Sequence, residues 1–251
     1  MTALSSDAVL TVFVIFCRIG SCLMLMPGFS SQRIPANVRL FISFSATLTL
    51  TPLLAGEIKG HLSGRDPAII IVLFISEIMT GFLIGFLARI FFGALETLAG
   101  AIAMSIGLTS ALAGPIDENE SLPAISTLIT LSAAVLIFLT DLHWEVLRGL
   151  CASYSALPVS GWFDARVDLV QVTDCLTKSF FISLRVSSPF IVYALIVNFV
   201  IGLAGKLIPQ IPVYFMTSPA VLAGGLLLLY ATCKPFMEIF NAAFSAWLAE
   251  G

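Results

Sequence analysis

Charged residues are scarce in this chain, and they never gather into a run. Only 11% of the 251 residues are Asp, Glu, Lys or Arg, against about a quarter in a soluble domain. The 12 basic residues stand singly, so the sequence offers no basic patch to a nucleic acid. With 59% apolar residues and a mean hydropathy of +1.05, the composition predicts an integral membrane protein, with residues 1–251 as a single domain.

The motifs of catalytic and metal sites are missing as well. The sequence has no G-x-S-x-G, no Walker loop and no His/Cys constellation, so we predict no enzyme, no cofactor and no metal site. The five cysteines form no CxxC pair. A disulfide between Cys151 and Cys175 is conceivable if their shared loop faces an oxidising compartment. Residues 1–6 hold no Lys or Arg, which predicts that the first apolar segment is retained and not cleaved as a signal peptide.

Six stretches are apolar enough to span or insert into a bilayer, and a glycine-rich stretch makes a seventh. The six cover residues 8–26, 40–54, 68–88, 124–139, 180–202 and 213–232. A spanning helix needs about 20 residues, so the short second and fourth stretches favour burial against protein. We predict an all-α membrane protein with six to seven long apolar helices. The mixed-charge stretch 141–174 is predicted to be a short excursion outside the membrane with an amphipathic helix.

Glycine recurs at helical spacing in the middle of the chain. The positions are a GxxxG pair and a ladder of period seven: Gly81, Gly85, Gly93, Gly100, Gly107 and Gly114. A period of seven returns to nearly the same helix face, and a face without side chains lets another backbone approach closely in lipid. We interpret both features as assembly surfaces with partners outside the chain; the alternative is an ordinary tight contact within one membrane protein. As one straight helix, residues 68–114 would be about 70 Å long, so they must break or leave the bilayer.

Four charged residues stand in apolar surroundings, namely Arg18, Glu77, Arg185 and Lys206. A charge in hydrocarbon is costly and by default marks a pairing or functional site. We therefore predict that all four are buried against protein, with Lys206 neutralising a carboxylate or a helix C-terminus. Lys and Arg are spread almost evenly over alternate loops, so the sequence predicts no membrane orientation.

Read in order, the unusual residues form four groups. They are Arg18, Gly20, Pro27, Gly28, Phe29, Ser30, Ile34, Pro35, Val38 and Arg39; Glu77, Gly81 and Gly85; Ala99, Gly100, Ile106, Gly107, Leu108, Asp117 and Pro123; and Asn198, Gly202, Leu203, Pro209, Gln210, Phe215 and Pro219. Over nearly the whole chain, these groups resemble the motifs of the FliR family of flagellar biosynthesis proteins. Two departures are Lys206, where the family usually has Arg, and Pro115-Ile116-Asp117, which replaces an Asp-Pro in the central loop.

The resemblance implies a subunit of the flagellar type III export gate in the bacterial inner membrane, at the basal body. Such subunits are bent helical hairpins in a helical hetero-oligomer, with FliP-like and FliQ-like partners and an FlhB-like subunit, and they pass unfolded flagellar proteins across the membrane. The homologous gate subunit of a virulence secretion system shares the same motifs and stays open as an alternative. A small-solute carrier is a third reading, but it should show an internal repeat.

The central loop is where the resemblance places closure of the pore. We expect the segment from Gly107 onward to narrow the closed channel, because its apolar residues would exclude water and its glycine and proline permit a non-helical path. The residues assigned to this gate are Gly107, Leu108, Leu112, Gly114, Pro115, Ile116 and Asp117.

Overall fold

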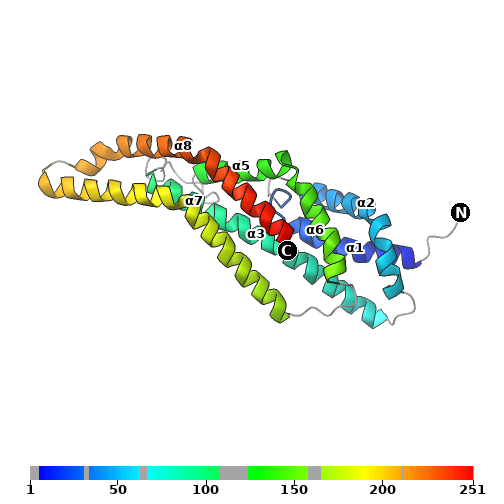
Figure 1. Ribbon diagram of the computed structural model, residues 1–251. Helices are drawn as coiled ribbons and strands as arrows, with labels where there is room; N and C mark the ends of the chain where they lie inside the picture. The colour runs from blue at the N-terminus through cyan, green and yellow to red at the C-terminus, as the bar shows by residue number, and fades with distance from the viewer. Residues whose placement is uncertain are drawn as a thin grey trace. The chain divides into compact units, whose positions relative to one another are not determined.

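The computed structural model describes residues 6–30, 34–62, 67–107, 124–157, 165–210 and 212–250. Within these ranges every regular element is an α-helix (Figure 1). The helices are α1 (Ser6–Leu25), α2 (Ala36–Leu62), α3 (Pro67–Ser105), α5 (Ala124–Leu139), α6 (Leu142–Ala156), α7 (Ala165–Leu207) and α8 (Val213–Glu250). Five of them are long and apolar enough to cross a bilayer, or six spans result if the broken pair α5 and α6 counts as one. The predicted all-α membrane fold is confirmed.

Each predicted apolar stretch lies in a helix, but several helices extend well beyond their stretch. The short stretch 40–54 belongs to the 27-residue α2. The stretch 141–174, predicted to be a short excursion outside the membrane, holds α6 and the first ten residues of α7, which begins at Ala165. The amphipathic helix expected in that stretch is α6, whose buried residues recur at every fourth position: Leu142, Val146, Leu150 and Tyr154.

Helix α3 is continuous over 39 residues, which makes it about 58 Å long at 1.5 Å per residue. It contains Gly93 and Gly100, and no proline follows Pro67 at its first position; single glycines weaken a helix without breaking it. The helix therefore does not break before Ser105. Because it exceeds the hydrocarbon thickness of about 30 Å, part of α3 must leave the bilayer or lie against protein.

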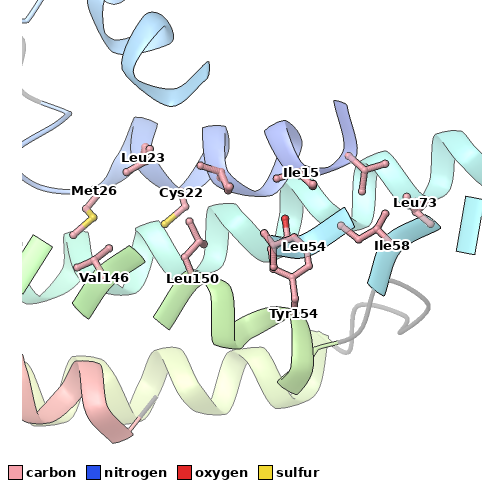
Figure 2. Close-up of a cluster of buried hydrophobic side chains, with 12 residues drawn as sticks. Ile15, Cys22, Leu23, Met26, Leu54, Ile58, Leu73, Val146, Leu150 and Tyr154 are labelled. Carbon is pink, nitrogen blue, oxygen red and sulfur yellow. The ribbon is translucent and has the colours of Figure 1, made fainter. Parts of the chain in front are cut away.

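The chain divides into two compact units. Unit 1 comprises Met1–Phe91, Asp141–Leu176 and Leu248–Gly251, and unit 2 comprises Phe92–Thr140 and Thr177–Trp247. The core of unit 1 is a cluster of buried side chains from α1, α2, α3 and α6 (Figure 2). Its labelled members are Ile15, Cys22, Leu23, Met26, Leu54, Ile58, Leu73, Val146, Leu150 and Tyr154.

Unit 2 is built from the second half of α3, from α5, and from most of α7 and α8. The ring of Phe92 on α3 makes edge-to-face contacts with two rings of α8, Phe240 at 5.3 Å and Phe244 at 5.8 Å between centroids. Helices α7 and α8 lie side by side and run in opposite directions (Figure 1), and the hydroxyl of Tyr193 on α7 donates to the carbonyl of Val221 on α8 at 2.7 Å. This hydrogen bond fixes the register of the α7–α8 hairpin.

Candidate functional site

A buried ion pair joins α1 and α3 within unit 1. Nε of Arg18 donates to Oε2 of Glu77 at 2.7 Å, and Nη2 donates to Oε1 at 2.8 Å. Both side chains are 1% exposed. Two parallel bonds make this the strongest geometry available to an arginine and a carboxylate, and a charge in an apolar interior needs such a partner. Two of the four charges that the sequence singles out are therefore paired with each other.

Arg18 also binds the carboxyl end of α6. Its Nη1 donates to the carbonyl and the hydroxyl of Ser153 at 3.0 and 3.2 Å, and Nη2 donates to the carbonyl of Leu157 at 3.0 Å. Together with the bonds to Glu77, these contacts use all five N–H donors of the guanidinium group. The guanidinium carbon lies 4.0 Å from the ring centroid of Tyr154, a cation–π contact. One side chain thus ties α1, α3 and α6 together.

The GxxxG pair of α3 packs against α1 of the same chain. A β carbon on Gly81 would collide with the carbonyl oxygen of Arg18, and one on Gly85 would lie 2.6 Å from the carbonyl oxygen of Cys22. The prediction that this pair faces a partner outside the chain is wrong. Glu77, Gly81 and Gly85 are four residues apart and share one helix face, so the same face of α3 holds the carboxylate and the close backbone contact.

Gly93 and Gly100 of the glycine ladder have no such contact among the described residues. A β carbon on either glycine would meet no heavy atom of these residues within 4 Å. Gly107 also faces open space, but its φ of +75° is left-handed, and its N–H donates to the carbonyl of Met104 at 3.0 Å. Gly107 is therefore the glycine C-cap that ends α3, and close packing does not explain it. Gly114 lies outside the described residues.

The other two predicted buried charges are exposed in the chain itself. Both Arg185 and Lys206 stand on α7 with exposed side chains, so the expectation of burial fails for them here. The reason is that α7 has little cover: only six of the 39 residues in its apolar span Leu169–Leu207 are buried among the described residues. Lys206 lies in the last turn of α7, where its charge complements the helix C-terminus, one of the two roles the sequence suggests.

Two adjacent glycines of α8 lie against other helices: Gly225 against the end of α3 and Gly224 against α7. A β carbon on Gly225 would collide with the side chain of Ile106, which is completely buried. A β carbon on Gly224 would lie 2.6 Å from the hydroxyl oxygen of Tyr193, the group that bonds the carbonyl of Val221. Two neighbouring glycines thus admit one side chain from α3 and one from α7.

A small cavity lies beside this contact, within unit 2. Its polar lining comes from the end of α3, from α7 and from α8, and includes Ser105, Asn198, Tyr214 and Ser218 together with Gly107. Asn198 is the first residue of the fourth motif, so the structure brings that motif next to the glycine cap of the third.

The remaining predicted gate residues lie outside the described residues. They are Leu108, Leu112, Gly114, Pro115, Ile116 and Asp117. Cys151 and Cys175 are both free thiols, so the disulfide considered from the sequence is absent. The Cys175 thiol instead donates to the carbonyl of Leu87 at 3.6 Å.

Several residues of these contacts are not predicted from the sequence. Ser153 and Tyr154 carry no spacing that connects them with Arg18, more than 130 residues away. The Gly224-Gly225 doublet does have a signal, since two adjacent glycines inside a helical stretch are costly and call for a packing reason. Tyr193, its neighbour on α7, has none.

Most of the chain matches known proteins. The model of the family described as "Bacterial export proteins, family 1" matches residues 9–247. The flagellar biosynthetic protein FliR of Caulobacter vibrioides is 29% identical over 86% of this chain and 85% of its own. FliR of Aquifex aeolicus is 27% identical over 90% and 86%, and the Yop proteins translocation protein T of Yersinia pestis is 26% identical over 91% and 88%. The resemblance to the FliR family is confirmed, and the chain belongs to family 1 of the bacterial export proteins.

Proposed function

We propose that this chain is a subunit of the flagellar type III protein export gate. It sits in the bacterial inner membrane as a multi-pass protein and helps to form and close the channel that passes unfolded flagellar proteins. Family membership supplies the export role, and the names of its relatives in Caulobacter and Aquifex supply the flagellar setting. The driving energy comes from other components, because the sequence carries no nucleotide-binding motif.

The observation that carries the proposal is the uncovered length of α7 and α8. Their apolar spans, Leu169–Leu207 and Val213–Leu248, contain 39 and 36 residues, of which six and four are buried within the described part of the chain. At 1.5 Å per residue, each span is between about 54 and 59 Å long, whereas the hydrocarbon of a bilayer is about 30 Å thick. Lipid can cover only part of that length, so other apolar protein surfaces must cover the rest.

This requirement supports a hetero-oligomer with FliP-like and FliQ-like membrane subunits, joined by an FlhB-like subunit. Helices that associate in lipid need close shape contact, since apolar side chains gain nothing by leaving acyl chains. The open faces at Gly93 and Gly100 offer such contact, because a neighbouring backbone could approach them without meeting a side chain. Arg185 and Lys206 would find carboxylates or water in the same assembly, because neither charge can face hydrocarbon.

The gate itself we assign to the segment that starts at Gly107. The support is that α3 ends there in a left-handed glycine cap, so the chain must change direction at this point. The apolar members of the segment would narrow the closed pore, and Asp117 would remain in contact with water.

Complementation and co-purification test the proposal together. A non-motile strain that lacks its own copy of this subunit should regain motility with the wild-type chain, and tagged chain should recover the FliP-like and FliQ-like subunits in one complex. Restoration of effector secretion in a virulence system, without motility, would instead support the virulence alternative. A chain that is active alone in vesicles, without these subunits, would favour a carrier and refute the proposal.

A further inference from the structure

At the Gly224-Gly225 doublet, the backbone of α8 lies against Tyr193 of α7 and against Ile106, the residue that follows α3. Gly225 receives Ile106, whose Cβ would lie 2.5 Å and whose Cα would lie 3.3 Å from a β carbon at position 225. Because the backbone Cα of Ile106 would also lie in tight contact with this β carbon, a larger residue at 225 would displace the end of α3 itself. Rotation of a side chain would not relieve the contact.

The neighbouring glycine receives α7 in the same way. The hydroxyl of Tyr193 passes over Gly224 to reach the carbonyl of Val221. Because this part-buried hydrogen bond forms only at one alignment of the two helices, it favours one register of α7 against α8. Ile106 is β-branched and has few rotamers available, so its contact with Gly225 is equally rigid.

The contrast with the open glycines makes the contact specific. On α3, Gly93 and Gly100 face open space, and so does Gly202 on α7. Ile106 directly precedes the cap at Gly107, whose N–H bond to Met104 closes the last turn of α3. The position of Gly107 is therefore set by the α7–α8 hairpin.

We infer that Ile106, Gly225, Gly224 and Tyr193 form a rigid joint, which makes the end of α3 and the α7–α8 hairpin move as one body. We call them positioning residues, because their effect on the gate comes from the position that they give to Gly107. The inference rests on the proposed function: in an export gate, any displacement of the hairpin would be passed directly to Gly107. Loosening the joint should then let the closed gate leak without preventing assembly.

The test uses the full chain, expressed with its partner subunits in cells whose wild-type complex is already known to assemble and restore motility. Gly225→Ala should raise the uptake of a small solute several-fold at equal amounts of recovered complex. Gly149→Ala, which adds the same methyl group on α6 at a position where no described residue lies within 4 Å, should leave uptake unchanged. Ile106→Ala, which removes most of the side chain that Gly225 receives, should also raise uptake.

A second variant keeps the test decisive if Gly225→Ala prevents assembly. Tyr193→Phe retains the ring and removes only the hydrogen bond to Val221, so it should assemble and leak to a smaller extent. If both Gly225→Ala and Tyr193→Phe give complexes as tight as the wild type, the joint has no positioning role. If Ile106→Ala gives a complex as tight as the wild type, the contact between Ile106 and Gly225 does not position Gly107. Failure of the proposed function would be visible earlier, as absence of assembly and motility with the wild-type chain.

Discussion

Replacement of Arg18 by lysine is the most direct probe of how unit 1 is held together. Lysine keeps the positive charge opposite Glu77, but its three donors lie on one nitrogen, whereas the guanidinium group directs five donors in a planar fork. From the position of the Glu77 bonds, an ammonium group cannot also reach the acceptors on Ser153 and Leu157. Arg18→Lys should therefore loosen the end of α6 while α1 and α3 remain paired.

The magnitude follows from the hydrogen bonds. Arg18 donates three of its five bonds to α6, and a typical intramolecular hydrogen bond contributes about 0.5–1.5 kcal/mol. Arg18→Lys should therefore cost about 2–4 kcal/mol in total. Arg18→Leu should cost more, because it leaves Glu77 buried without a partner. This loss should be about 3–5 kcal/mol, in addition to the packing contacts of the Arg18 side chain. Arg18→Leu with Glu77→Leu should recover much of that loss, since it removes the second charge as well.

Thermal unfolding in one detergent, at one scan rate, would rank these variants. The expected order of apparent melting temperature is wild type, then the double leucine variant and Arg18→Lys, with Arg18→Leu lowest. Maleimide labelling of Cys151, a half-buried thiol on α6, reports the end of α6 separately and should accelerate in Arg18→Lys. Arg148→Lys is the matched control, because the Arg148–Glu145 pair is exposed and such pairs contribute less than about 1 kcal/mol. Wild-type stability and wild-type labelling in Arg18→Lys would refute the reasoning.

Three further pairs of substitutions, compared in the same melting assay, separate the roles of individual residues. Gly81→Ala should cost about 1–3 kcal/mol, because its methyl group forces α1 away from α3, whereas Gly93→Ala should be neutral or stabilising by up to about 1 kcal/mol; equal effects would contradict the difference in packing. Gly107→Ala should cost about 1–2 kcal/mol owing to its left-handed φ, and Gly100→Ala should not. Lys206→Glu should lower the stability by about 0.3–1 kcal/mol at the end of α7, and Lys206→Arg should leave it unchanged. If Lys206 instead pairs with a partner's carboxylate, Lys206→Glu should reduce export without lowering the melting temperature.

The sequence predicts the helices of this protein better than it predicts what they touch. Apolar runs locate every described span, because a membrane helix satisfies its backbone internally and depends little on its neighbours. Arg18 and Glu77 are recognisable as costly charges for the same reason. Their pairing with each other depends on how α1 crosses α3, and no local spacing encodes a contact between residues 59 positions apart.

Glycine spacing shows the same limit more clearly. A row of glycines reports that a helix face lacks side chains, but it does not report whether a backbone lies against that face. Gly81 and Gly85 have their partner in α1, whereas Gly93 and Gly100 have none among the described residues. The buried side of α3 in this region is formed by its neighbours, among them Leu95, Ala99 and Ile102.

The polar groups show which part of the chain is complete by itself. In unit 1, the charge of Arg18 is met by Glu77, and its remaining donors are met by α6. On α7, Arg185 and Lys206 stay exposed on a helix in which six of the 39 residues of the apolar span are buried. Hydrocarbon cannot accept either charge, and water cannot cover so much apolar surface without a large free-energy cost. An assembly meets both requirements at once, because a partner helix can offer an apolar face and a carboxylate together, and this is the physical reason that a chain with such helices works as a subunit.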